Sequence, residues 1–139
     1  IKLYYGGCDE DHGSVGTDGS ASVGLATLRK DGFASLDASG ATGTITTKPL
    51  THAQGPLRVN YAASGGSIRV EVLDESGEVI PGYGESDCTP LEGDDTDATA
   101  TWDAQNELPT EPCEIRLRFI LEDASVYSFA AGDLLRLGT

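Results

Sequence analysis

The stretch from Gly55 to Gly77 constrains the fold more than any other part of the chain. It alternates apolar and polar residues on both sides of a Ser-Gly-Gly-Ser break. The apolar positions are Leu57, Val59 and Tyr61 before the break and Ile68, Val70 and Val72 after it. A period of two is typical of β-strands that bury one face, and a glycine pair between two such runs indicates a turn. The stretch therefore predicts a β-hairpin.

The position of the break suggests a register for this hairpin. One register places Tyr61 opposite Ile68, Val59 opposite Val70, Arg58 opposite Glu71 and Asn60 opposite Arg69. A two-stranded hairpin covers only one of its faces, so it needs a second layer to be stable in water. We expect the rest of the chain to supply that layer.

Short strand-like runs recur along the whole chain. They cover residues 1–7, 22–28, 33–38, 43–50, 98–102, 115–121 and 125–131, and residues 29–32 (Arg-Lys-Asp-Gly) predict a turn. No run of ten or more residues has a helical period, and the chain contains 18 glycines. About nine short strands without a crossover helix predict an all-β fold made of two packed antiparallel sheets. We expect a jelly-roll sandwich, with an immunoglobulin-like sandwich as the alternative.

The length of 139 residues fits one domain with a hydrophobic core. We assign residues 1–30 to leading strands, 31–131 to the sandwich and 132–139 to a tail. Residues 78–97 are expected to form a loop, and a loop of that length is usually functional, ordered by a metal ion or a disulfide, or flexible. The chain has no initiator methionine, signal peptide or membrane-spanning apolar run, so we expect a piece of a longer protein.

The charge of the chain excludes some partners. There are 23 acidic and 9 basic residues, which give a formal net charge of −14. Such a balance disfavours nucleic acid or an anionic membrane as the main partner. It is compatible with divalent cations and with a simply solvated acidic surface.

Catalytic motifs are missing from the sequence. GxSxG, HExxH, the P-loop and paired CxxC motifs are all absent, and neither His12 nor His52 lies beside a nucleophile motif. Pairs of carboxylates, which a glycosidase needs, are so frequent here that they identify no site. We therefore expect that this chain alone is not an enzyme.

Two groups of segments resemble a known protein family. LYYGGCDEDHG (3–13) and VGLATLRKDGF (23–33) are similar to the closing blade of five-bladed β-propeller glycoside hydrolases of the family 32 and 43 type. The rest resembles the β-sandwich appended to such propellers in bacterial proteins that degrade polysaccharides. This second likeness lies in residues 31–38, 46–50, 58–62, 70–83, 86–94, 102, 116–119 and 124–129.

The resemblance implies a function that the motifs themselves do not carry. It implies a non-catalytic carbohydrate-binding module that targets a parent glycoside hydrolase to its polysaccharide, in an extracellular or periplasmic setting. The alternative is a structural or protein-interaction sandwich that buttresses the propeller and binds no sugar. An exposed tyrosine or tryptophan in a polar groove would favour the first hypothesis. A continuous apolar patch on the sandwich would favour the second.

Aromatic residues are the first candidates for sugar binding, because their ring faces stack on pyranose rings. Tyr83 lies between Gly82 and Gly84 in the expected loop and is predicted to be exposed. Trp102 shares the parity of two alanines in its strand, so it is a candidate either for the core or for a sugar platform.

Outward-pointing polar residues of the predicted strands are a second candidate group. They are Arg58, Asn60, Arg69, Arg116 and Arg118. If their strands adjoin, the four arginines form a cationic face suited to an acidic polysaccharide. Alternatively, Glu71 and other acidic neighbours hold the arginines in ordinary cross-strand ion pairs.

The acidic loop is the candidate metal site. Calcium prefers several oxygen ligands from irregular loops, and the candidate ligands are Asp87, Asp94, Asp95 and Asp97. No EF-hand spacing is present, so an ordinary solvated loop is the alternative. Cys88 and Cys113 flank this region, and the sequence leaves open whether they form a disulfide or remain free thiols.

Overall fold

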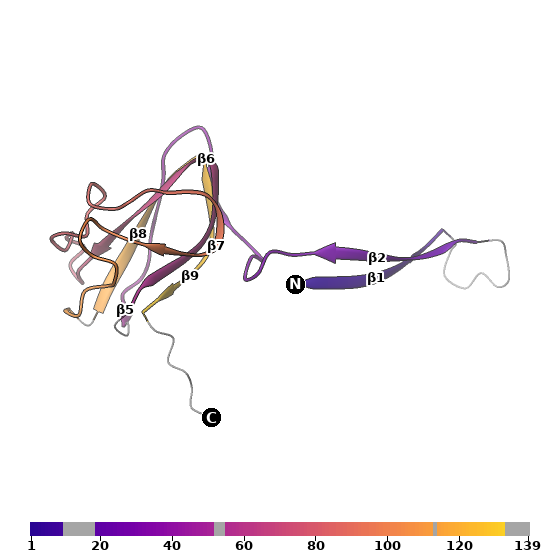
Figure 1. Cartoon of the computed structure of the whole chain (residues 1–139), viewed down its shortest axis with the longest axis horizontal. Coiled ribbons are helices and arrows are strands. Elements are labelled where there is room, and N and C mark those ends of the chain that lie inside the picture. Colours follow the sequence, from indigo (N-terminus) through magenta and orange to yellow (C-terminus); the bar gives the residue numbers. More distant parts are fainter. Residues whose placement is uncertain (10–18, 52–54, 113, 133–139) are drawn as a thin grey trace, which may run out of the picture.

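The computed structural model describes residues 1–9, 19–51, 55–112 and 114–132. The described residues form nine strands and no helix, which confirms the all-β prediction. They make a seven-stranded antiparallel sheet folded over a core, and a separate two-stranded sheet. Figure 1 shows the folded sheet as a compact sandwich from which the two-stranded sheet, called here the ribbon, extends. The predicted antiparallel β-sandwich is therefore confirmed.

The ribbon consists of β1 (Lys2–Cys8) and β2 (Ala21–Thr27). These strands pair from Lys2 opposite Thr27 to Cys8 opposite Ala21, in an unbroken antiparallel register. All side chains of β1 are exposed, and Gly24 is the one residue of β2 that is not. The ribbon is thus not covered by the described part of the sandwich.

The sandwich contains the other seven strands. They are β3 (Leu36–Ala38), β4 (Gly43–Thr46), β5 (Leu50–Thr51), β6 (Leu57–Leu73), β7 (Leu91–Ala100), β8 (Glu114–Glu122) and β9 (Ala124–Ala131). The strand order is β3-β9-β6-β8-β4, with β7 added on β6 and β5 added on β8. The central position of β6 makes it the common element of the whole sheet.

The predicted hairpin at residues 57–73 is wrong, because the stretch is one continuous strand of 17 residues. The first half of β6 lies between β7 and β9, with Val59 opposite Ala98 and Phe129. The second half pairs with β8, with Val70 opposite Phe119. The two halves therefore belong to different layers of the sandwich, and none of the expected hairpin pairs exists.

The glycine pair bends β6 where a turn was predicted. A Cβ atom on Gly66 would lie 1.8 Å from the carbonyl oxygen of Glu122, so only glycine allows this approach of the two backbones. Asp123 lies beside this contact, between β8 and β9, and has a φ of 41°. Strand β6 and the connection from β8 to β9 thus change direction at the same corner of the sandwich. The alternating pattern predicted the strands correctly, but the glycines serve a bend between layers.

Strand β7 replaces the last part of the expected loop. Residues 78–97 were predicted to be irregular, yet the strand begins at Leu91 and continues to Ala100. It pairs only with β6, so it is an edge strand. Charged residues are common on edge strands because they discourage pairing with another chain. The acidic sequence of this segment therefore suits an edge strand.

The core lies between the two halves of the folded sheet. Its largest fully buried side chains are Trp102, Phe119, Leu57, Ile68, Leu73, Ile115, Leu117, Leu121, Val59, Val70 and Val72. Tyr61 is also buried, so all six apolar positions of the alternating pattern in β6 lie in the core. The expected strand at residues 43–50 is divided into β4 and β5, and Trp102 lies beyond the end of β7 in isolated bridges to Cys88 and Gln105.

Candidate functional site

The ribbon joins the sandwich through the predicted turn at residues 29–32. The amide of Gly32 donates to the carbonyl of Arg29 at 3.3 Å, and Asp31 has a φ of 49°. A turn at this place is therefore confirmed. The turn brings the side chain of Arg29 against the outer face of β6, β7 and β9.

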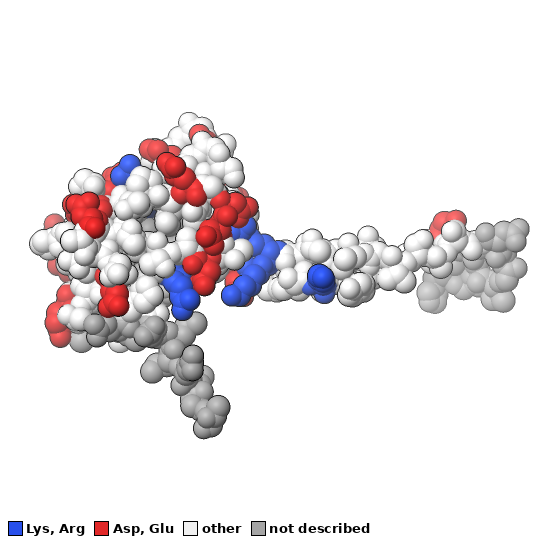
Figure 2. Space-filling view, in the orientation of Figure 1, with Lys and Arg blue, Asp and Glu red and all other residues white. Residues whose placement is uncertain are grey.

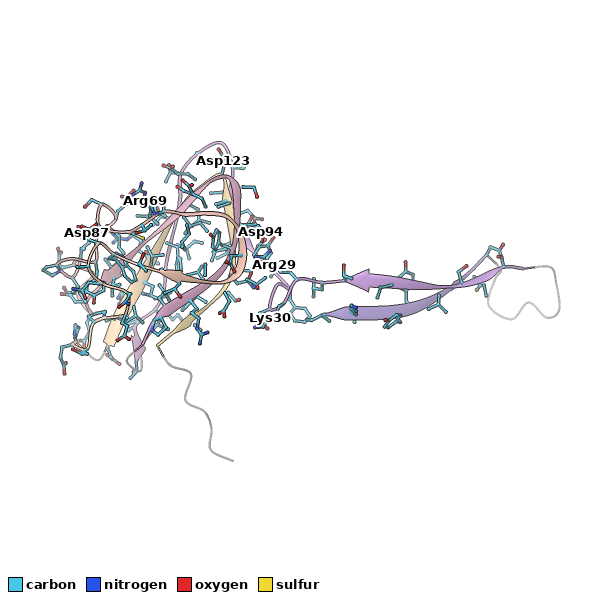
Figure 3. All side chains as sticks on the ribbon, viewed as in Figure 1. Arg29, Lys30, Arg69, Asp87, Asp94 and Asp123 are labelled. Carbon is cyan, nitrogen blue, oxygen red and sulfur yellow. The ribbon has the colours of Figure 1, made fainter. Side chains whose placement is uncertain are left out.

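Arg29 is the residue that fastens this joint. Its Nε donates to Oδ1 of Asn60 and its Nη1 to Oδ1 of Asp94, both at 2.5 Å. Its Nη2 donates to the backbone carbonyls of Tyr61 at 2.7 Å and Asp95 at 2.6 Å. The guanidinium carbon also lies 4.7 Å from the centre of the Tyr127 ring. Figure 3 shows Arg29 beside Asp94 where the ribbon meets the sandwich.

Asn60 holds the other side of the joint. It is 4% exposed, and its Nδ2 donates to the carbonyl of Lys30 at 2.7 Å and to Oγ of Ser128 at 3.3 Å. Both ends of the amide are therefore used within the protein. Asn60 was predicted to bind ligand, and the structure places it beneath the turn, where it orients Arg29 and Lys30.

A cleft of about 330 Å³ lies next to this joint. It opens on the outer face of β6, β7 and β9, beside the turn at the base of the ribbon. Its polar lining consists of the exposed residues Lys30, Asp31, Thr96 and Asp97 and the half-buried residues Arg58 and Ser128. Figure 2 shows basic side chains next to acidic ones at this junction. Two basic and two acidic residues thus line one hollow.

Arg58 and Asp97 face each other in the cleft. Nη1 of Arg58 lies 3.3 Å from Oδ2 of Asp97, and the two side chains remain 40% and 55% exposed. An exposed ion pair of this kind is worth about 0–1 kcal/mol, because water solvates and screens both charges. Both residues therefore keep donor and acceptor groups available to a ligand.

The four predicted arginines do not form one cationic face. Arg58 lies on the first half of β6, opposite Thr99 and Ala130, whereas the other three lie on the opposite layer. Arg118 is opposite Glu71 and its Nη1 is 2.8 Å from Oε2 of that residue. The alternative of cross-strand ion pairs is therefore correct for Arg118.

The remaining two arginines contact backbone carbonyls. Nη1 of Arg69 lies 3.4 Å from the carbonyls of Glu85 and Cys88. Nη1 of Arg116 lies 3.5 Å from the carbonyl of Thr47. These are long contacts, so both side chains are only loosely held.

Both predicted aromatic platforms are buried. Trp102 is fully buried, and its Nε1 donates to the carbonyl of Val70 at 2.7 Å. Tyr83 is 7% exposed, packs on Trp102 with ring centres 5.1 Å apart, and donates its hydroxyl to the carbonyl of Glu107. The expectation that Tyr83 is exposed is wrong. Gly82, with a φ of 84°, allows a tight turn against the core, in which the carbonyl of Tyr83 accepts from the amide of Val72 in β6 at 3.0 Å.

The predicted calcium ligands lie apart or are engaged by protein groups. Asp94 and Asp97 pair with Arg29 and Arg58, and Oδ1 of Asp95 accepts from the amide of Asp97 at 2.9 Å. Asp87 accepts from the amide of Gly84 at 2.9 Å. Within the described ranges no three metal-ligating side chains cluster. Calcium binding stays a prediction, to be tested by the melting temperature with calcium and with a chelator.

Cys88 is a buried free thiol. Its Sγ accepts from the amide of Val70 at 3.2 Å, and burial is the main cause that raises the pKa of the thiol. Cys113 lies outside the described residues, as do His12 and His52. The last pair between β6 and β7 is Ile68 opposite Leu91, and the thiol of Cys88 then accepts the hydrogen bond of the next inward-facing residue of β6, Val70.

Sequence reasoning missed the two features that define the site. Arg29 was read only as part of a turn, since the sequence does not show which carbonyls will surround its guanidinium. The second is Phe129, which is 39% exposed at the rim between the cleft and an adjoining apolar groove of about 440 Å³. A bulge in β9 shifts the pairing with β6 by one residue between Ser128 and Val126. The sequence pattern does not predict this bulge.

None of the described segments forms an apolar helix of membrane-spanning length. Comparisons with protein-family models, with curated proteins and with solved structures gave no match to this chain.

Proposed function

We propose that the protein is a non-catalytic module that binds an oligosaccharide or polysaccharide in the cleft beside the ribbon. The observation that carries this proposal is the pairing of exposed donors and acceptors in one hollow, with Arg58 and Asp97 facing each other at 3.3 Å. A sugar hydroxyl both donates and accepts hydrogen bonds, so it can bridge such a pair. Lys30, Thr96 and Ser128 add further polar groups around it.

The charge balance of the cleft favours a neutral glycan over an acidic one. Lys30 and Arg58 are offset by Asp31 and Asp97, and the whole chain carries a net charge of −14. A sulfate or uronate entering the cleft would be attracted by two cations but repelled by two carboxylates and by the acidic body. The acidic polysaccharide expected from four adjoining arginines is therefore the less favoured ligand.

A screen of immobilised glycans tests this function. The panel contains neutral and acidic plant and algal polysaccharides, and the measured quantity is retention of the protein. Substitution of Arg58 by Gln or of Asp97 by Asn should weaken retention, because each removes one half of the facing pair. Arg116→Gln is the matched control, since Arg116 lies on the other layer. Absence of retention on every glycan would end the proposal.

The biological setting follows from the resemblance described above. The module would raise the local concentration of a parent glycoside hydrolase on its polysaccharide without itself reacting. Such enzymes work outside the cytoplasm, so an extracellular or periplasmic location belongs to the same proposal.

The ribbon favours a second candidate function, protein–protein interaction. Its exposed large apolar side chains are Leu3, Tyr4, Tyr5, Val23 and Leu25. Tyr4, Val23 and Leu25 share one face of the ribbon, and exposed apolar side chains gathered on one face usually mark an interface. The sandwich would then be a structural module whose ribbon is covered by another β-sheet, as the likeness to a closing propeller blade implies. Sugar binding is not needed for this function.

A further inference from the structure

The apolar groove beside the cleft lies between the terminal strands of the folded sheet, β3 and β4. Leu36, Val126 and Phe129 line it from the layer of β3 and β9. Ile45 and Phe119 line it from the layer of β4 and β8, and the ring centres of Phe119 and Phe129 lie 5.3 Å apart. Phe119 is buried whereas Leu36 is 58% exposed, so the groove leads from the solvent to the core.

The groove suits a hydrocarbon group of a ligand. Among the described residues its lining contains no Asp, Glu, Lys or Arg, although these residues make up 23% of the chain. Its volume of about 440 Å³ lies within the range of ligand sites, about 300–1,000 Å³. Leu36 and Phe129 stay partly exposed, and a ligand that covers them removes apolar surface from water. A charged group would lose its hydration there without gaining a partner.

The groove and the cleft adjoin along β9. Ser128 and Phe129 line both hollows, and the chain runs from the cleft at residues 30–31 to the groove at residues 34–36. Strand β3 pairs with β9 only as far as Val126, so no described strand pairs with β9 at Ser128 and Phe129 on the side away from β6. Such a strand edge presents backbone N–H and C=O groups to a ligand that crosses it.

A ligand that occupies both hollows has a polar part and an apolar part. We propose that the glycan bound in the cleft carries acyl groups in ester linkage, and that one of these groups enters the groove. The sugar hydroxyls then meet Arg58 and Asp97, the ester crosses the edge of β9, and the hydrocarbon contacts Leu36 and Phe129. An ester is uncharged and its carbonyl accepts hydrogen bonds, which fits both the neutral charge balance of the cleft and the N–H groups of a strand edge. This inference rests on the proposed sugar binding and names its ligand class, an O-acylated neutral polysaccharide.

The test compares the neutral polysaccharides of the screen in unsubstituted, lightly acetylated and lightly butyrylated form. Affinity electrophoresis of the whole chain gives a dissociation constant for each form. Each buried methylene strengthens binding about fourfold, so we expect the butyrylated form to bind tightest and the unsubstituted form weakest. Equal affinity for all forms of a bound polysaccharide would overturn this inference and leave sugar binding in the cleft standing. Binding to no form of any polysaccharide would overturn both.

Substitutions in the groove test where the acyl group binds. Leu36→Asn makes the mouth of the groove polar, and Ala34→Asp places a charge on its exposed rim without removing a packed side chain. Each should abolish the advantage of the acylated forms and leave the affinity for the unsubstituted form unchanged. Leu3→Asn is the matched control, because Leu3 is 55% exposed in β1 and lies outside the groove. It should keep the affinities of the parent.

Arg58→Gln separates the two hollows. It should weaken the binding of all forms by the same factor, because Arg58 lines the cleft and not the groove. An acyl advantage that survives both groove variants, or that Leu3→Asn lowers equally, would overturn the inference. Acylated polysaccharides bound by the Arg58→Gln variant as tightly as by the parent would also overturn it, since the acyl group would then bind without the cleft.

Discussion

Asn60 accepts a hydrogen bond from Nε of Arg29 with its Oδ1 and donates one to the carbonyl of Lys30 with its Nδ2. One buried side chain of β6 therefore grips both residues that lead from the ribbon into the turn. The joint between the two parts of the molecule is a network of hydrogen bonds, whereas the core of the sandwich is apolar. Single substitutions can thus test the joint separately from the core.

Replacing Arg29 should loosen this joint. Arg29→Ala leaves the buried oxygen of Asn60 and the carbonyl of Tyr61 without their donors, so we expect a loss of about 1–3 kcal/mol in the free energy of unfolding. Arg29→Lys keeps the charge but cannot reach four acceptors at once, and should fall between the parent and the alanine variant. Denaturant titration followed by circular dichroism measures both.

Arg58→Lys is the control for this comparison, because Arg58 makes one exposed ion pair and should change stability by less than about 1 kcal/mol. An Arg29→Ala variant as stable as the Arg58→Lys variant would show that the network adds nothing to folding.

The corner of β6 predicts opposite outcomes for two adjacent glycines. Gly66→Ala pushes a methyl group into the carbonyl of Glu122, so backbone must move and we expect a loss of about 1–3 kcal/mol or more. A Cβ on Gly65 meets nothing within 4 Å, so Gly65→Ala should stay within about 1 kcal/mol of the parent. The thermal unfolding midpoints of the two variants decide the matter. Equal midpoints would contradict the close approach of β6 to the β8–β9 corner.

The strands could be predicted because burial on one face leaves a period of two, which holds for the alternating apolar positions of β6, although Asn60, Glu71 and Leu73 are buried at the other parity. A period of two does not indicate which strands a given strand will pair with. Gly65 and Gly66 fit a hairpin turn and a bend between layers equally well, and only the approach of Glu122 distinguishes them. The first part of β7, residues 91–97, was missed for a related reason, since an edge strand facing water keeps few apolar residues.

Trp102 should behave as a core residue. Trp102→Phe removes the donor to the Val70 carbonyl and leaves a gap beside Tyr83, so we expect a loss of at least about 1–3 kcal/mol. It is also the single tryptophan of the chain, so its native emission should be that of an apolar environment and shift to the red on unfolding. Native emission typical of water would contradict its full burial.

Alkaline pH should weaken the fold. Burial is the main cause that raises the pKa of Cys88, Tyr61 and Tyr83, with Asp95 and other carboxylates adding to the shift at Tyr61. In the unfolded chain, thiols and phenols lose their protons near their ordinary pKa values of about 8.5 and about 10. The unfolded state therefore binds fewer protons above these values, and stability falls as pH rises toward the higher folded pKa values.

Urea midpoints at pH 7, 9 and 10.5 measure this effect. They should decrease in that order, and Cys88→Ala should reduce the decrease between the first two. A midpoint that is constant to pH 10.5 would contradict the protonated, buried state of these three groups.

The candidate site was less predictable than the fold. Arg58 lies in the cleft as an outward residue of its strand, which the alternating pattern supplied. Its partners could not be inferred, because Asp97 reaches it only through the pairing of β6 with β7, and Lys30 only through the turn that Arg29 fixes. Asn60 has the same parity as Arg58, yet the turn at residues 29–32 covers Asn60 and leaves Arg58 partly exposed.

The place of β6 in the chain also decides when the sandwich can form during synthesis. Its neighbours β7, β8 and β9 all follow it in sequence, and the last of them ends at Ala131. Until that residue has left the ribosome, the 17-residue strand β6, with one apolar face, has no complete set of partners. Nascent chains stalled before β8 should therefore be held by chaperones or degraded, and the fold should appear in one late step.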